Sequence, residues 1–356
     1  MRRQTLVAAA ALIALATPTL AQSVAPPAGP AAAAAEAPQA PMTAAERKTV
    51  IETLAKTLED NFVFPDVAKK YAAMLRANLA SGAYDQLADP KDFAKRVTAD
   101  LQAVSPDGHL RLALMSAFRG PPPGTAPMHG GAPLGLDETK MIGDVMYLDF
   151  NGFPGDPEEV KALRTFMLAH ADAKAVIIDS RHNHGGGLDE IDVMAALLYP
   201  QRTTLVRMDT RAAVAVAHGD PLGNAPTIVK QPSPPEFDRR DHIAIPDPVE
   251  HRLSHVPVYY LVSHKTASAG EHAALVFKRT HRATLVGETT YGAGHYGGVE
   301  PIGDRFAAFI PVGRTYDPDT NWDWEGKGVA PDVAVPADQA LDKALELAKA
   351  AGAHPN

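Results

Sequence analysis

The 356-residue chain lacks cysteine, lacks an excess of basic residues, and lacks an apolar run long enough to span a bilayer. Without cysteine there is no disulfide scaffold, no cysteine-liganded zinc or iron–sulfur site, no cysteine nucleophile and no lipid-attachment cysteine. Its 34 Lys and Arg residues are outnumbered by 42 Asp and Glu, which gives a net charge of −8. A nucleic-acid binder needs a basic face, so we expect no nucleic-acid partner.

What the chain does have is a hydrophobic fraction of 46%, enough to build a sizeable core. Its length suggests about two domains, of which the second is small. Disorder over most of the chain is therefore excluded.

The N-terminal segment has the features of an export signal. Arg2 and Arg3 precede an almost wholly apolar stretch at residues 6–16, and small residues stand just before Gln22. This pattern predicts a cleaved signal peptide over residues 1–21. A membrane anchor is the alternative, but eleven apolar residues are too few for a hydrocarbon core of roughly 30 Å. We expect a periplasmic or secreted protein without stable membrane insertion.

Residues 22–42 are nearly all Ala and Pro, which predicts an extended or disordered linker. A capping box at Thr43 and Glu46 then starts a helix, and further amphipathic helices open at Pro65 and near Pro90. These helices predict a small N-terminal domain over residues 43–118. A Gly- and Pro-rich connector follows at residues 120–133.

Strands and helices alternate from about residue 144 onward. Strands are predicted at residues 145–150, 175–178, 203–208, 256–262, 283–286 and 305–312, and helices at 156–170, 189–198, 267–280 and 337–350. Residues 213–255 are polar and Pro-rich, so we expect an irregular surface excursion there. The alternation predicts an α/β domain over residues 135–352, with ligands at the C-terminal ends of its strands.

Ser268 is the strongest local candidate for chemistry. It follows a buried strand and a short loop, and it begins an amphipathic helix among the small residues Ala267, Ala269 and Gly270. Such a serine projects from a rigid support near the positive end of a helix. On local features alone, a serine that caps the helix is the better explanation.

Three further segments carry weaker signals. Three consecutive glycines end DSRHNHGGG at residues 179–187, and their amides are suited to binding an oxyanion, although such glycines often only turn the chain. His109 lies in a Gly-containing loop and is a candidate general base, although a histidine is more often a plain surface residue. Glu325, between two tryptophans and two glycines, is a candidate acceptor for an imidazole or a simple turn residue.

Metal binding is a weaker interpretation. His182 and His184 form an H-x-H pair, and His251 and His255 lie one helical turn apart. No HExxH motif and no carboxylate spacing complete a site. We expect no metal and no cofactor.

Four segments, taken together and in order, resemble the tail-specific (C-terminal-processing) serine peptidase family. They are DGHLRL at residues 107–112, AVIIDSRHNHGGG at 175–187, TASAGEHAALVFKRTHRATLVGETTYGAGH at 266–295 and WEGKGVAPDVAV at 324–335. The closer resemblance is to the tricorn-core and interphotoreceptor-retinoid-binding-protein-like branch. The resemblance implies a crotonase/ClpP-like spiral of ββα units as the catalytic domain, with a small N-terminal helical domain.

The same resemblance implies roles for particular residues. Ser268 matches the nucleophile, His109 the base and Glu325 the acid that orients it. Gly186 and the amide of Ala269 match the oxyanion hole. Glu288 and Glu271 are lower-ranked alternatives for the acid.

The sequence departs from the better-known processing peptidases at two points. Those enzymes use a Ser–Lys dyad, and the matching position here, 25 residues after Ser268, is Ala293, while Lys278 lies on the helix. They also carry a PDZ domain, for which there is no room between His109 and the strand at residue 145. Both departures favour the Ser–His–Glu branch, and tail specificity does not follow.

The sequence thus predicts an exported serine-type peptidase that acts on peptides or proteins. Because His109 and Ser268 belong to different domains, we expect the site in the cleft between them. Two alternatives stay open: a non-catalytic carrier of lipid or retinoid-like ligands, and an esterase or lactonase for small exported metabolites.

Overall fold

The N-terminal part of the chain is helical, as predicted. The computed structural model describes residues 40–118 and 135–355, so the predicted signal peptide, the linker as far as residue 39 and the connector at 120–133 lie outside the described residues. Three helices follow in order: α1 (Ala44–Asn61), α2 (Pro65–Ala80) and α3 (Pro90–Val104). The Thr43 side chain accepts from the Glu46 amide at 3.1 Å, which confirms the predicted start of α1.

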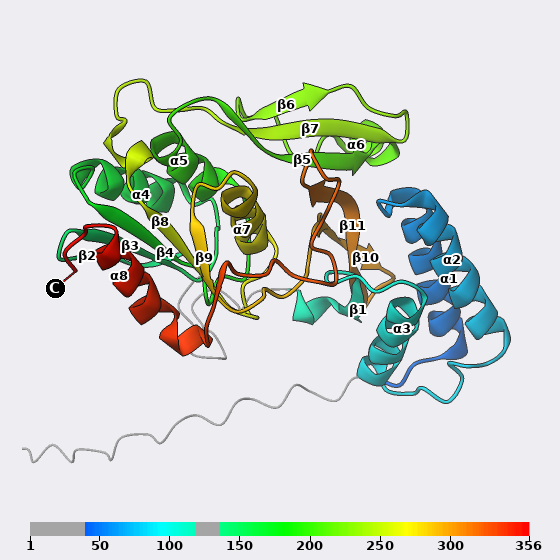
Figure 1. Ribbon diagram of the computed structural model, residues 1–356. Coiled ribbons are helices and arrows are strands. Elements are labelled where there is room, and N and C mark those ends of the chain that lie inside the picture. The colour runs from blue at the N-terminus through cyan, green and yellow to red at the C-terminus, as the bar shows by residue number, and fades with distance from the viewer. Residues whose placement is uncertain (1–39, 119–134, 356) are drawn as a thin grey trace, which may run out of the picture. The chain divides into compact units, whose positions relative to one another are not determined.

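A largely parallel six-stranded sheet forms the centre of the C-terminal part (Figure 1). Its order is β12 (Val333–Ala334), β9 (Thr284–Gly287), β8 (Val258–Val262), β4 (Ala175–Asp179), β3 (Val145–Phe150) and β2 (Leu136–Ile142). Only β2, at one edge, runs antiparallel to its neighbour. Every residue of β4 and β8 is buried, as expected for strands covered on both faces.

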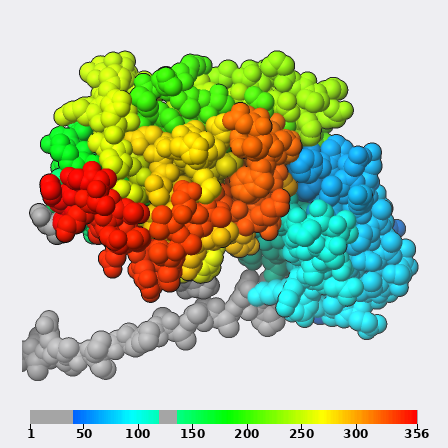
Figure 2. Space-filling view, viewed as in Figure 1, coloured from blue at the N-terminus to red at the C-terminus, as the bar shows by residue number. Residues whose placement is uncertain are grey.

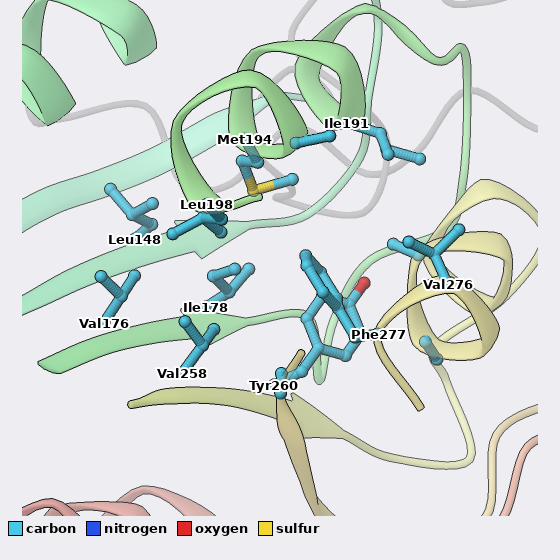
Figure 3. Close-up of a cluster of buried hydrophobic side chains, with 14 of the residues drawn as sticks. Leu148, Val176, Ile178, Ile191, Met194, Leu198, Val258, Tyr260, Val276 and Phe277 are labelled. Carbon is cyan, nitrogen blue, oxygen red and sulfur yellow. The ribbon is translucent and has the colours of Figure 1, made fainter. Parts of the chain in front are cut away.

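Helices cover both faces of this sheet. On one face lie α4 (Pro157–Ala169), α5 (Asp189–Leu198) and α7 (Ala269–Arg279), and on the other lies α8 (Ala340–Ala350), which follows a short 3₁₀ turn at Ala337–Gln339. Figure 3 shows how Met194 and Leu198 of α5 and Phe277 of α7 point into the core above the strands. This core fixes α7, and with it the N-terminal end of that helix, against the sheet.

A second, antiparallel sheet joins the two parts of the chain. Its order is β1 (Arg111–Leu114), β11 (Phe306–Tyr316), β5 (Thr203–Arg211), β7 (Phe237–Ala244) and β6 (Ile228–Gln231), and β10 (His295–Ile302) also pairs with β11. A 3₁₀ turn at Met115–Ala117 follows β1. Because β1 comes directly after α3, the helical part is hydrogen-bonded to a strand some 200 residues later, with Arg111 opposite Phe309.

The three helices also share a hydrophobic core with β11. Ile51 and Leu54 of α1 and Phe93 of α3 belong to the same buried cluster as Phe306 and Ile310. In the space-filling view, the blue and cyan surface of the helices adjoins the orange surface of the later strands (Figure 2). The α/β fold with a small N-terminal helical part is confirmed, and the two domain boundaries stay predictions.

The prediction of an irregular excursion at residues 213–255 was wrong. This segment forms most of α6 (Ala212–His218), β6, β7 and a 3₁₀ turn at Arg252–His255. Strand β7 carries charged residues that pair across the sheet: Arg239 binds Asp209 at 2.7 Å and Asp241 binds Arg207 at 2.7 Å. Such pairing stabilises a strand without the alternation of apolar residues on which the prediction relied.

Strands β2 and β10 were also not predicted. β2 reads LDETKMI and lies at a sheet edge, and β10 contains Gly297, Gly298 and Pro301, which are unfavourable in most strands. No helix within residues 40–118 and 135–355 combines the length and the apolar character needed to cross a membrane.

Candidate active site

A cavity of about 370 Å³ lies beside the N-terminal end of α7. Its lining includes Gly186, Ser268, Ala269, Ala293, His295 and Trp324. The predicted nucleophile and both predicted oxyanion-hole residues therefore face one space. His109 and Glu325 are not part of its lining.

Ser268 holds an unusual backbone conformation at this cavity. Its φ of 55° and ψ of −118° lie in a region that non-glycine residues rarely adopt and that costs about 1–3 kcal/mol. The residue occupies the N-cap position of α7, where its amide donates to Oε2 of Glu271 at 2.9 Å. Ser268 thus occupies the N-cap position that its local sequence suggests, and it also lines the cavity.

The glycine loop after β4 packs directly against Ser268. A Cβ atom added to Gly185 would lie 2.6 Å from Cβ of Ser268, and one added to Gly186 would lie 1.9 Å from the carbonyl oxygen of Phe153. Both glycines have positive φ, 97° and 139°. The close approach to Ser268 therefore requires glycine at position 185, and the close approach to the Phe153 backbone requires it at position 186.

Asn183 connects this loop to the serine segment. Its Oδ1 accepts from the amide of Gly185 at 2.8 Å, and its carbonyl oxygen accepts from the amide of Ala267 at 2.9 Å. The amides of Gly186 and Ala269 donate no hydrogen bond to another residue within 40–118 and 135–355. Both residues line the cavity, so two unused donors are available there to a ligand oxygen.

Glu271 fastens a second loop, residues 290–295, to the start of α7. Its Oε1 accepts from the Thr290 hydroxyl and the Gly292 amide, both at 2.6 Å. Its Oε2 accepts from the Ala293 amide at 2.8 Å and from the Ser268 amide. Burial raises the pKa of Glu271, although these four hydrogen bonds act in the opposite direction.

The remaining alternative acid, Glu288, lies elsewhere. It binds Nδ1 of His264 at 3.0 Å and the Ala337 amide at 3.2 Å, and it does not line the cavity.

Glu325 forms hydrogen bonds with backbone amides, and its Oε2 also lies 3.6 Å from Nδ1 of His295. Its Oε1 accepts from Gly108 at 2.6 Å, and its Oε2 accepts from Gly294 at 2.6 Å and His295 at 3.0 Å. It therefore joins the loop that carries His109 to the start of β10. The pKa of Glu325 is raised by burial and by the nearby charge of Asp107.

His109, the predicted base, makes no hydrogen bond to Glu325 in this structure. Its ring stacks on Phe309, with centroids 4.9 Å apart and planes inclined by 23°. Its Nδ1 is buried and has no partner among the described residues. Burial lowers the pKa of His109 to about 4.

Sequence reasoning missed a second histidine–carboxylate pair, His295 with Asp107. The two meet at 2.7 Å between Nδ1 and Oδ2, while Oδ1 of Asp107 accepts from the amides of His109 at 3.0 Å and Leu110 at 2.9 Å. Both residues stand inside quoted motifs, at the end of GETTYGAGH and the start of DGHLRL. Nothing in the sequence says that residues 188 positions apart meet.

The electrostatics of this pair follow from its burial. Burial lowers the pKa of His295, but the hydrogen bond and charge of Asp107, with the charges of Glu325 and Asp323, outweigh it, so the net shift is upward. The pKa of Asp107 is lowered, because His295 and two backbone amides outweigh the burial that would raise it. The imidazole therefore keeps its second proton to a higher pH than an isolated histidine does, and the Asp107 carboxylate beside it loses its proton at a lower pH than usual.

Asp107, His295 and Glu325 are also the one group of three metal-ligating side chains that residues 40–118 and 135–355 bring within 4.8 Å of one another. Their chemistry does not fit a metal site well. Both oxygens of Glu325 and one of Asp107 already accept backbone hydrogen bonds, and the other oxygen of Asp107 binds the imidazole. The pairs His182/His184 and His251/His255 join no such group among the described residues.

A buried chain of side chains lies elsewhere along the same cavity. Nε2 of His272 meets Nδ1 of His242 at 2.9 Å, and Nε2 of His242 meets Asp192 at 2.8 Å. His272 and Asp192 line the cavity. Burial holds the pKa of His272 well below 6.5, so this imidazole is neutral.

Comparison with known proteins identifies the family. The profile of peptidase family S41 matches residues 144–335, and that of the N-terminal domain of peptidase S41 in eukaryotic IRBP matches residues 32–141. A carboxyl-terminal-processing protease of Synechocystis is 26% identical over 227 residues, which is 60% of this chain and 45% of the relative. The chloroplastic carboxyl-terminal-processing peptidase 3 of Arabidopsis thaliana is 34% identical over 83 residues, 23% of this chain and 16% of the relative. The chain thus spans less than half the length of these curated relatives.

Solved structures share the fold at low sequence identity. A protein from Parabacteroides merdae superposes with a TM-score of 0.57 at 16% identity, covering 85% of this chain and 96% of the other. The photosystem II D1 C-terminal processing protease superposes with a TM-score of 0.54 at 15% identity, covering 88% and 99%. The S41 profile covers more than half of the residues and includes the glycine loop, Ser268 and Glu325, and the resemblance seen in the sequence is thereby confirmed: this chain belongs to peptidase family S41.

Proposed function

We propose that this protein is a serine-type peptidase that hydrolyses peptide bonds, with Ser268 as its nucleophile. The observation that carries the proposal is the position of Ser268, held in a strained conformation in a cavity beside the unused amides of Gly186 and Ala269. Backbone strain persists where the surrounding structure enforces it, and such sites are frequently functional. Family membership supports the same chemistry.

In the proposed reaction, Oγ of Ser268 attacks the carbonyl carbon of the scissile bond while a histidine accepts its proton. The amides of Gly186 and Ala269 donate to the oxygen that becomes negative. The histidine then protonates the leaving amine, and water releases the acyl group from the serine. Loss of one oxyanion donor costs on the order of 10²–10³ in turnover.

The sequence assigns the proton acceptor to His109 and its orienting acid to Glu325, and that triad stays a prediction. To act in it, the His109 ring would have to leave its stack on Phe309 and approach Glu325, whose Oε1 accepts one backbone amide and can accept a second hydrogen bond. Acid–base geometry in an unliganded site often tightens only when substrate binds.

The proposed substrates are peptides or proteins of the compartment outside the cytoplasmic membrane. Export rests on the basic and apolar pattern of residues 1–21. Two relatives are named carboxyl-terminal-processing enzymes, which makes polypeptide substrates the natural first choice.

A carrier of small apolar ligands is the second candidate. Met208, Leu222 and Ile228 line part of the cavity, and its volume of about 370 Å³ falls in the range of small-molecule sites. Such a carrier needs no reactive serine.

A fluorophosphonate probe on the purified full chain tests the proposal. We expect labelling of the wild type, none in Ser268→Ala, and new amino termini in a mixed-peptide digest with the wild type alone. An unlabelled wild type that binds a fluorescent fatty acid would favour the carrier. Labelling with hydrolysis of esters but no peptides would favour an esterase.

A further inference from the structure

His295 faces the same cavity as Ser268 and is fixed beside it. Oε2 of Glu271 accepts from the amides of both Ser268 and Ala293, at 2.9 and 2.8 Å, so the two backbone segments are joined through one oxygen atom. His295 follows two residues later and is held by Oε2 of Glu325 through its own amide. Both Ser268 and His295 line the cavity.

Asp107 sets the state of the His295 ring. A carboxylate can only accept, so Nδ1 of His295 carries the proton that is shared at 2.7 Å, and Nε2 of the neutral ring is left as the acceptor. No described residue forms a hydrogen bond to that Nε2. An imidazole with a carboxylate on one nitrogen and a free acceptor on the other is the arrangement that a general base for a serine requires.

The groups packed around His295 support proton uptake. Asp107, Glu325 at 3.6 Å and Asp323 are the charged groups that raise its pKa, against the effect of burial. The ring of Phe64 meets the imidazole edge-on at 5.4 Å and carries no charge. His109, whose pKa is lowered to about 4, is neutral at neutral pH and adds no competing cation.

His109 is less suited to the same role in this structure. It does not line the cavity, its Nδ1 has no hydrogen-bond partner to fix a tautomer, and its ring stacks on Phe309. The loop that carries His109 instead binds other residues of the site through its neighbours, Asp107 and Gly108. Asp107 at the head of the loop reaches across to His295, and Gly108 is bound to Glu325.

We infer that His295 accepts the proton of Ser268 and that Asp107 is the residue that positions it. The inference rests on the proposed function and replaces its acid–base pair. The N-terminal part of the chain would then supply the carboxylate of the triad, while the imidazole comes from β10.

The reaction balances with these groups alone. As Oγ of Ser268 bonds to the carbonyl carbon, its proton passes to Nε2 of His295, and the imidazolium stays hydrogen-bonded to Asp107. That proton moves to the amine nitrogen as the carbon–nitrogen bond breaks. A water molecule then gives one proton to Nε2 and its oxygen to the acyl carbon, and the proton returns to Oγ as the acid leaves.

The test measures the rate of fluorophosphonate labelling against pH in the full chain. We expect His295→Gln to slow labelling by about 10²–10⁴, the usual contribution of a general base, and by at least tenfold more than His109→Gln does. The matched control is His264→Gln, which removes an exposed histidine with its own carboxylate partner and should label at the wild-type rate.

Two further measurements do not depend on whether His295→Gln folds. The wild-type labelling rate should rise with a midpoint above 6.5, the ordinary histidine pKa, because the pKa of His295 is raised, and Asp107→Asn should move that midpoint to lower pH. A wild-type midpoint at or below 6.5, or a midpoint that Asp107→Asn leaves unchanged, would overturn the assignment.

The outcomes distinguish the assignment of His295 as the base from the assignment of Ser268 as the nucleophile. A wild type that labels, with labelling retained in His295→Gln and lost in His109→Gln, refutes His295 as the base and leaves Ser268 as the nucleophile. A wild type that never labels at any pH refutes the serine mechanism and His295 with it.

Discussion

Glu271→Gln is the substitution that most directly probes how the site is built. The side chain keeps its size, but one carboxylate oxygen becomes an amide nitrogen that can only donate. Each oxygen of Glu271 now accepts two hydrogen bonds, from Thr290 and Gly292 on one side and from Ala293 and Ser268 on the other. An amide nitrogen that faces Ala293 and Ser268 meets two backbone donors, and one that faces Thr290 and Gly292 meets a single fixed donor, because the Thr290 hydroxyl can turn and accept.

The magnitude follows from the number of bonds lost. Hydrogen bonds to a charged group contribute about 1.5–3 kcal/mol each, so the loss of one or two of them amounts to about 1.5–6 kcal/mol. Glutamine also removes the cost of burying a charge, which is the cause of the raised pKa of Glu271. We therefore expect the free energy of unfolding to fall by about 2–3 kcal/mol, in the lower half of that range.

Urea unfolding followed by tryptophan fluorescence measures the change, and the labelling rate at a fixed pH measures its effect on Ser268. We expect labelling to slow on the order of a hundredfold, because a displacement of about 1 Å at a reacting group has that effect. The matched control is Glu190→Gln. Glu190 is likewise a buried glutamate in the first turn of a helix, but its Oε1 accepts only the Gly155 amide and its Oε2 has no partner among the described residues.

The control should therefore change the free energy of unfolding by less than about 1 kcal/mol, since glutamine can still accept from Gly155. Equal losses in both variants, or a Glu271→Gln protein with wild-type stability and labelling, would refute the idea that this carboxylate holds the two loops together.

Three other expectations can be tested with the same two assays. Gly185→Ala should abolish labelling and lower the free energy of unfolding by at least about 1 kcal/mol, because its Cβ would contact Ser268 and its φ is positive. Gly298→Ala, whose Cβ would contact nothing within 4 Å, should change neither quantity, and equal behaviour of the two variants would contradict this reasoning. Ser268→Gly should raise the free energy of unfolding by about 1–2 kcal/mol by relieving its strained backbone, and a loss of stability would show that no strain is stored there. Because the pKa of His272 is lowered by folding, the unfolded chain takes up a proton below pH 6.5 that the folded chain does not, and the free energy of unfolding falls as pH decreases. Between pH 7.5 and 5 this decrease should be about 2 kcal/mol smaller in His272→Gln than in the wild type. An equal decrease in the two proteins would contradict the reasoning.

The fold was largely predictable because its elements carry local signals. The capping box at Thr43 and the prolines that begin α2 and α3 mark helix starts that depend only on neighbouring residues. The uninterrupted apolar residues of β4 and β8 likewise predict buried strands from local sequence alone. β7 was not predicted because its stability comes from ion pairs with β5, a partner that no local pattern reveals.

The residues of the candidate site differ in the same way: some could be predicted from local sequence and others could not. Ser268 and the glycines stand in segments whose local pattern already suggests a loop before a helix and a tight turn. The pairing of His295 with Asp107 depends instead on β1 and β10 flanking the same strand, β11. Sequence motifs place residues in segments, but only the packing of those segments decides which carboxylate meets which imidazole.

The pairing of β1 with β11 has a consequence for how the chain is made. The helices α1–α3 are synthesised before β11, and the apolar surface that they share with Phe306 and Ile310 stays uncovered until about 200 further residues have been added. During that interval the exposed apolar surface can bind chaperones or associate with other chains. A fragment that stops before residue 306 should therefore aggregate or be degraded, and a separately supplied C-terminal piece should restore solubility only if it is present while the first piece is being translated.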